Sequence, residues 1–148
     1  MTMAVTDEQV AALRAQLAGS LQEHKRLLAQ LDRAAARTGY SALLSAAFCE
    51  AVERRFAKGA TAADVMEFVG NVRSRFDELA DKIDPRTAER LILAVYTDEH
   101  VPDDLSLEIR YRIQLLLLAA LIADEQLDGA GLDAFLVDAR KLADQWIG

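Results

Sequence analysis

The chain has 148 residues, of which 52% are hydrophobic and 28% are charged, and its net charge is -7. This length and apolar content suit one globular domain that folds without disulfides or a structural metal. With only seven Gly and two Pro, the composition excludes collagen-like, proline-rich and low-complexity chains and disfavours a strand-and-turn architecture. The composition therefore favours a helical fold.

Features of targeting and compartment point to a cytoplasmic protein. Residues 1–6 lack the basic and apolar regions of a secretory signal. The longest apolar run, 115–123, has nine residues, fewer than the roughly 20 that cross a bilayer. The lone Cys49 cannot form an internal disulfide, which fits a reducing compartment. We expect no membrane contact, and the bias toward Ala, Leu and Arg is typical of a GC-rich bacterial genome.

The N-terminal segment has the pattern of one long helix. Thr6 and Gln9 form a capping box that predicts a helix start. Apolar residues then recur at spacings of three, four or seven, which predicts a helix over 7–37 that Gly39 closes. A helix of about 45 Å needs a partner along its length, and Gly-Ser at 19–20 is where it would bend. We expect a hairpin arm or the contact of a homodimer.

Three further helices are predicted in the middle of the chain. The second covers about 41–58, with Gly59 as its C-cap. The third begins after the cap Thr61 and reaches about Ile83. Asp84 and Pro85 are typical of a helix cap and a first helical residue, so a short fourth helix follows.

The last third of the chain predicts a polar loop and two helices. The loop is TDEHVPDD at 97–104, and Asp103 or Ser106 caps the fifth helix after it. This helix contains the apolar run 115–123, so we expect it at the centre of the fold. A sixth helix follows the glycines at 129 and 131. The sequence thus predicts a single all-α domain over 1–148, a bundle of about six helices with a long N-terminal helix and an apolar central fifth helix.

Charge is distributed unevenly along the chain. Residues 1–74 carry a net charge of +1 and residues 75–148 carry -8. The acidic half can attract a basic partner and repels free nucleic acid. Four arginines of the second and third helices could form a basic patch, namely Arg54, Arg55, Arg73 and Arg75. Because aromatic residues are few and no basic recognition helix is evident, we expect no nucleic-acid binding.

The 97–104 loop holds the densest group of oxygen and nitrogen donors: Asp98, Glu99, His100, Asp103 and Asp104. A hard cation could use such donors, but the spacing matches no metal signature, and the last two aspartates are natural helix caps. We assign these five residues to contact with a protein partner. No metal or other cofactor is expected.

The sequence DEQLDG at 124–129 places its donors like the start of an EF-hand loop. Phe135 stands where that loop needs its bidentate Glu, so calcium binding is not expected. The longer stretch AALIADEQLDGAGLDAF resembles the helix-turn-helix of the TerB-like helical proteins associated with tellurite resistance. The resemblance covers some 20 residues. Glu125 and Asp133 have to substitute for acidic positions of the family's pattern, and we carry no function across.

No pattern of catalytic residues emerges. His24 is predicted to be a packing or surface residue, and Cys49 a small buried thiol. Glu50 stands four residues before Arg54, the favourable spacing for an ion pair on a helix surface. The motifs HExxH, CxxC and Walker A and the di-iron pair Glu-x-x-His do not occur in the sequence.

The leading hypothesis is a non-enzymatic protein-interaction or regulatory protein that forms a homodimer. The alternative is a small-molecule sensor or carrier, whose apolar pocket would lie beside Phe56, Phe68, Phe76 or Trp146. An enzyme with an unrecognised site is a third class.

Overall fold

The computed structural model describes residues 5–56, 60–75, 83–96 and 106–147. Within these ranges the chain forms seven α-helices and no strand, so the all-helical prediction is confirmed for this part of the chain. The helices are α1 (Asp7–Leu17), α2 (Leu21–Gln30), α3 (Arg33–Phe56), α4 (Ala62–Arg75), α5 (Pro85–Tyr96), α6 (Leu107–Glu125) and α7 (Gly129–Ile147).

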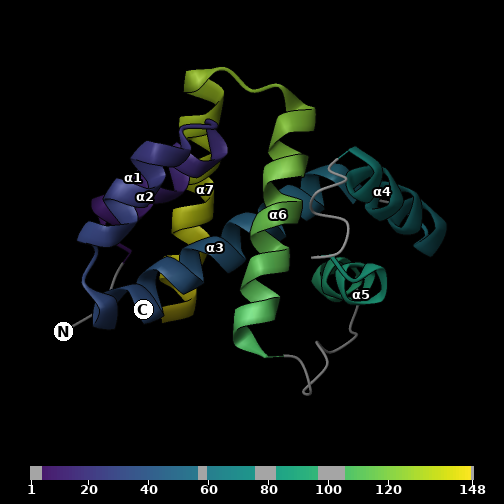
Figure 1. Cartoon of the computed structure of the whole chain (residues 1–148), viewed down its shortest axis with the longest axis horizontal. Helices are drawn as coiled ribbons and strands as arrows, with labels where there is room; N and C mark the ends of the chain where they lie inside the picture. The colour runs from purple at the N-terminus through teal and green to yellow at the C-terminus, as the bar shows by residue number, and fades with distance from the viewer. Residues whose placement is uncertain (1–4, 57–59, 76–82, 97–105, 148) are drawn as a thin grey trace.

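The predicted helix over 7–37 is wrong as a single element, although its bend was placed correctly. The chain breaks after α1, where Gly19 has a φ of +83°, a conformation that glycine adopts without strain. α2 then packs against α1, so the segment is a hairpin within one chain (Figure 1). His24 of α2 is buried and its Nδ1 lies 2.6 Å from the carbonyl oxygen of Ala12, which ties the two helices together. This agrees with a packing role for the histidine.

A second break, which the sequence analysis missed, separates α2 from α3. The Asp32 carboxylate accepts a hydrogen bond from the Ala34 amide at 2.9 Å and so caps the start of α3. Gly39 therefore lies inside a helix and closes none. Its missing side chain lets α3 approach α1, because a Cβ atom at this position would collide with the side-chain amide of Gln9. Gln9 is itself buried and accepts a hydrogen bond from the Thr6 amide, which confirms the capping box.

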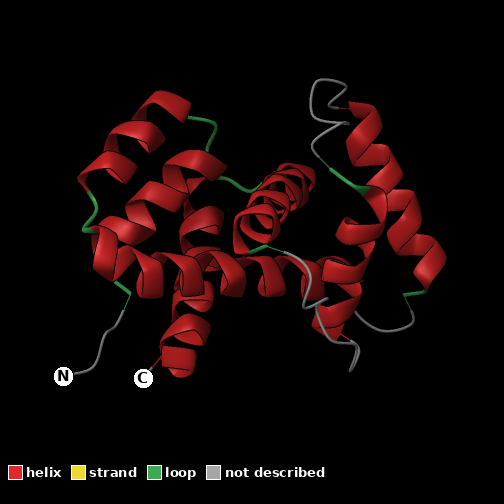
Figure 2. Ribbon diagram, turned by 60° about the horizontal axis from the view of Figure 1, so that its bottom comes forward, coloured by secondary structure: helices red, strands yellow, loops and turns green. Residues whose placement is uncertain are grey.

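α3 is the central helix. It contacts α1, α5, α6 and α7, and it runs from the α1–α2 pair to the α4–α5 pair at the other end of the molecule (Figures 1 and 2). The expected central element, the apolar helix α6, is buried along much of its second half but packs across α3. Small residues explain the difference, since Ala46, Ala47 and Ala51 are fully buried and let two helices approach α3 closely.

The remaining helices follow their predicted caps. Ser106 caps α6, with its side chain accepting from the Ile109 amide at 3.2 Å, and Pro85 is the first residue of α5. α6 and α7 form the helix-turn-helix expected for 119–135. Three expectations lie outside the described residues, namely the continuation of the third helix over 76–82, Gly59 as a cap, and the loop 97–104. That residues 1–148 form a single domain stays a prediction.

The close approach of Gln9 to Gly39 leads to a testable prediction about the free energy of unfolding. Gly39→Ala should lower the free energy of unfolding by about 1 kcal/mol, because displacing Gln9 removes its capping bond and outweighs the higher helix propensity of alanine. In a Gln9→Ala background the same substitution should be neutral or stabilising by up to about 1 kcal/mol. Urea unfolding of the four proteins measures both effects. An equal effect in the two backgrounds would show that the collision is unimportant.

Candidate functional site

The turn between α6 and α7 is the most unusual part of the described backbone. α6 ends at Glu125, and its C-cap Gln126 has a φ of 52°, in the left-handed region. Gln126 is the one residue other than glycine that the described ranges place there. Asp128 then caps α7, because its Oδ1 accepts a hydrogen bond from the Gly131 amide at 2.6 Å. We call residues 122–133 the corner.

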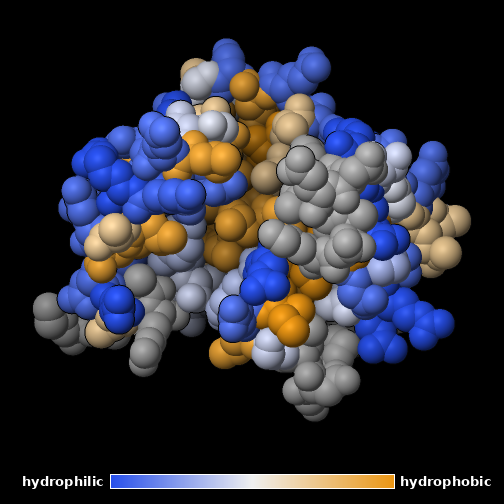
Figure 3. All heavy atoms as spheres, in the orientation of Figure 1, coloured by the Kyte–Doolittle hydropathy of each residue, from blue (hydrophilic) through white to orange (hydrophobic). Residues whose placement is uncertain are grey.

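A groove of about 400 Å³ opens between the corner and the last turn of α1. Figure 3 shows hydrophobic residues gathered in a hollow between the α1 side of the molecule and α6. Apolar and polar groups share the lining about equally, and three different helices and the turn contribute to it. The lining residues are Arg14, Leu17, Ala18, Ile122, Ala123, Gln126, Leu127, Asp128, Gly129 and Leu132.

Arg14 is the single cation in the lining of this groove. Its Nε lies 2.6 Å from Asp133 Oδ1, and its guanidinium donates to the carbonyl oxygen of Gly129 at 3.5 Å. The arginine thus connects the end of α1 to the start of α7. Its charge is already matched by a carboxylate, which leaves Asp128 as the second charged group of the lining.

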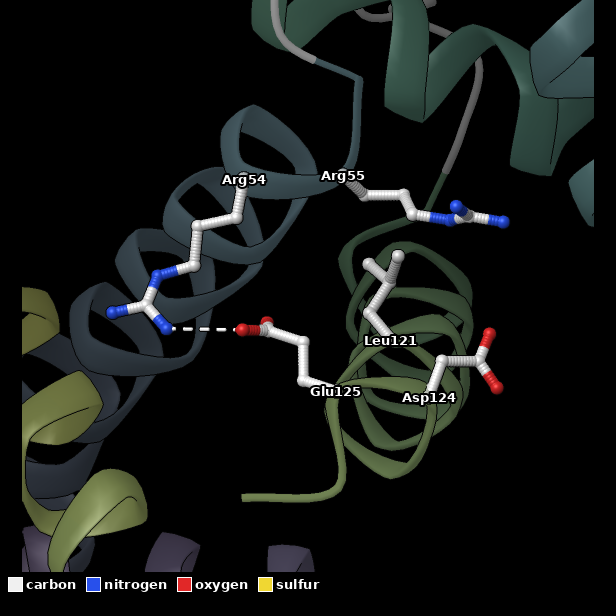
Figure 4. A pocket seen from close by; sticks show the side chains of 5 residues that line it. All are labelled: Arg54, Arg55, Leu121, Asp124 and Glu125. Carbon is white, nitrogen blue, oxygen red and sulfur yellow. Dashed lines mark hydrogen bonds and ion pairs between the residues drawn. The ribbon is translucent and has the colours of Figure 1, made fainter.

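On the other side of α6 lies a smaller notch of about 230 Å³, lined by Arg54, Arg55, Leu121, Asp124 and Glu125 (Figure 4). Arg54 points from α3 toward Glu125, and the two side chains meet at 3.1 Å. In the same figure Arg55, also on α3, extends away from Arg54 and passes Leu121 of α6.

Arg54 of α3 contacts three carboxylates beside the corner. Beyond Glu125, its guanidinium lies 3.7 Å from Glu50 and 3.9 Å from Asp138. The pair with Glu50 confirms the ion pair predicted from the spacing of four residues. The guanidinium also stands over the ring of the buried Phe135, 5.0 Å from its centroid, which adds a cation–π contact.

Two arginines of the predicted basic patch, Arg54 and Arg75, are paired with carboxylates. Arg75 of α4 binds both oxygens of Asp124, at 2.6 and 3.2 Å. Arg55 lies 5.9 Å from the ring centroids of Phe56 and Phe68, which stack edge to face. Because α6 ends in Asp124 and Glu125, with no basic residue in its last turn, its C-terminus is acidic where the helix dipole favours a cation. Arginines of α3 and α4 supply that positive charge from outside the helix.

The structure separates the other candidate residues. The five residues assigned to partner contact, Asp98, Glu99, His100, Asp103 and Asp104, lie outside the described residues. Cys49 is partly buried, and burial together with the nearby Glu53 raises the pKa of its thiol to about 11, which keeps it protonated and poorly nucleophilic at neutral pH.

The aromatic residues proposed to line a pocket do not converge. Phe56 and Phe68 are buried in the core against one another, whereas Trp146 is 50% exposed at the end of α7. Trp146 is therefore not part of the buried face of α7. Phe76 lies outside the described residues. A single aromatic pocket is therefore absent from the part of the chain that the structure describes.

Two further classes of site do not occur within the described ranges. No group of three or more His, Cys, Asp or Glu side chains there is placed to hold a metal ion. In the same ranges no helix has both the length and the apolar character of a membrane span.

Comparisons with known proteins identify no relative. No family model matches the chain, and searches of the curated proteins and of the solved structures find no significant match. The candidate site therefore rests on its geometry.

Sequence reasoning missed the groove, because its walls come from residues more than a hundred positions apart. One signal was present. The segment DEQLDG at 124–129 ends a helix without a glycine at the cap, since Gln126 stands where Gly is preferred.

The network around Arg54 predicts a stability effect larger than that of an ordinary surface ion pair. Arg54→Ala should lower the free energy of unfolding by about 1–2 kcal/mol, since it removes three carboxylate contacts and one ring contact. The control Arg112→Ala removes one exposed ion pair within α6, with Glu108 at 3.3 Å, and should cost less than about 0.5 kcal/mol. Denaturant unfolding at low and high salt measures both, and losses of equal size would contradict the network.

Proposed function

We propose that this is a non-enzymatic protein-interaction or regulatory protein that receives its partner in the groove at the corner. The observation that carries the proposal is the groove itself, a hollow of about 400 Å³ between α1, α6 and α7 that apolar and polar groups line together. Concave sites that combine apolar side chains with a few polar groups are the usual places of binding. The left-handed Gln126 in the lining supports this assignment, because strained backbone tends to gather at functional sites.

We also propose a homodimer, but its contact surface differs from the one that the sequence predicted. The apolar face of α1 is covered within its own chain by α2, α3, α6 and α7. α2 has one buried residue and exposes Leu21 and Leu28, which are 55% and 41% accessible and two helical turns apart. If the chain pairs with a second copy through its N-terminal segment, the contact is made by α2.

Two further expectations are kept as proposals. The acidic segment with Asp98, Glu99, His100, Asp103 and Asp104 is a second contact for the partner, and the protein acts in the cytoplasm. The alternative function, a small-molecule sensor or carrier, is supported by the volume of the groove, which falls in the range of roughly 300–1,000 Å³ typical of ligand sites.

Blocking the groove tests its role in partner binding. Ala123 is exposed and lines the groove, so Ala123→Trp fills the hollow without touching the core. Ala63 is exposed on α4, outside that lining, and Ala63→Trp is the matched control. We expect a stoichiometric protein partner to be captured from native cells by the wild type and the control and to be lost with Ala123→Trp.

Capture that survives Ala123→Trp would reject the groove as the binding site. A protein that comes out of native cells without a partner but with a bound small molecule would reject the interaction function in favour of the sensor. Mass spectrometry of the captured complex under mild conditions separates these results.

Sedimentation velocity over a range of concentrations tests the dimer. We expect a dimer that Leu21→Lys with Leu28→Lys converts to a monomer, because two charges in an apolar contact are costly to desolvate. The exposed surface position of both leucines keeps the fold intact, which circular dichroism checks. A wild-type protein that is monomeric at the highest concentration would remove the dimer from the proposal.

A further inference from the structure

We infer that residues 5–31 form a hinged arm that opens away from the rest of the chain and closes to complete the corner groove. The arm consists of the α1–α2 hairpin and the two residues before it. We call the described residues from 33 onward the body. The control of a binding site by the arm rests on the proposed function, whereas the opening of the arm does not.

The arm is joined to the body by a short connection and by one of its two helices. α2 ends before Leu31, whose backbone is extended, and α3 begins at Arg33, so the hinge is short. α2 packs mainly against α1, and the larger contacts of the arm with α3, α6 and α7 come from α1 (Figure 1). Because the contact between His24 and the Ala12 carbonyl oxygen lies within the arm, the hairpin can move as one unit.

The apolar surface that the arm buries is small. Its buried apolar residues are Val5, Ala12, Leu13 and Ala15. Only the valine and the leucine are larger than alanine, and hydrophobic stabilisation scales with the apolar area that is buried. Segments held by few buried apolar contacts open at a lower free energy than the core of the same protein. The arm is therefore the part of the described chain that we expect to open first.

Polar contacts with one face of α7 hold the arm closed. Three charged residues of α7, spaced seven and four positions apart, each bind the arm, and these are Asp133, Arg140 and Asp144. The first pairs with Arg14 at 2.6 Å. Arg140 donates to the carbonyl oxygen of Val5 and to the Asp7 carboxylate, both at 2.6 Å. Asp144 accepts from the Val5 amide at 2.9 Å, so side chains of α7 bind both backbone groups of this valine.

The same closure builds the groove. Arg14, Leu17 and Ala18 line it from the arm, and the rest of the lining comes from α6, α7 and the turn between them. An open arm therefore removes one wall. A partner that touches both walls binds the closed state alone, so the contacts on α7 set the fraction of molecules that can bind.

Amide hydrogen exchange followed by NMR tests the opening of the arm. In the wild type we expect the amide of Leu13 in α1 to be protected at least about tenfold less than that of Leu121 in α6, because the arm opens without global unfolding. Arg140→Ala should lower the protection of Leu13 about three- to tenfold, since it removes two contacts of the closed arm. Lys141→Ala, at the next and exposed position of α7, should change it less than about twofold.

A substitution confined to the body separates opening of the arm from unfolding of the whole chain. Arg54→Ala removes contacts of α3 with α6 and α7, and these contacts persist while the arm is open. It should therefore lower the protection of Leu121 about fivefold or more and leave that of Leu13 within about twofold. Equal losses at the two leucines would overturn the inference, because the arm would then be released only by global unfolding. Equal protection of both in the wild type, or no effect of Arg140→Ala on Leu13, would overturn it as well.

These failures are distinguishable from failure of the proposed function, because hydrogen exchange is measured on the free protein. If Ala123→Trp releases the native partner while Leu13 and Leu121 are equally protected, the groove is a rigid binding site and only the arm is wrong. If the arm opens while the native partner survives Ala123→Trp, the groove is not the interaction site and its control by the arm is rejected.

Discussion

The close packing of α6 and α7 against α3 is the constraint on which the rest of the structure depends. α3 presents fully buried alanines, Ala46, Ala47 and Ala51, where longer side chains would hold neighbouring helices apart. Both later helices contact it, and α1 packs against its first half beside Gly39. Because α1 and α7 are placed by the same helix, the hollow between them and the end of α6 has a defined width.

Electrostatics at the corner follows from this packing. The end of α6 brings Asp124 and Glu125 to a helix C-terminus, which is unfavourable by itself. Arginines from α1, α3 and α4 surround the corner and bind Asp133, Glu125 and Asp124, so three separate helices are attached to it. Each exposed pair adds only about 0–1 kcal/mol, and the arrangement around Arg54 is the part that is dense enough to matter for stability. The stability and the charge of the candidate site therefore depend on the same contacts.

The sequence predicted what is decided locally. The capping box at Thr6, the cap Ser106 and the cap Asp84 before Pro85 were predicted correctly, because a cap is an interaction between residues about three positions apart. Gly39 was misread as a helix end, since its role depends on a residue of another helix, Gln9, 30 positions earlier. The same limit explains the choice of the wrong central helix. Hydrophobicity marks α6 as buried but does not reveal that the alanine-rich α3 brings its neighbours together.

The groove was harder to predict from the sequence than the fold, because no residue pattern connects Leu17 with Leu132. One local feature is nonetheless informative in retrospect. A non-glycine residue in the left-handed region costs of order 1 kcal/mol or more, and a glycine at position 126 would avoid that cost. The stability of the helix end therefore does not account for a glutamine there. Gln126 lines the groove together with Ala18, the C-cap of α1, and its left-handed backbone is therefore one of the observations behind the proposed role of the groove in recognition.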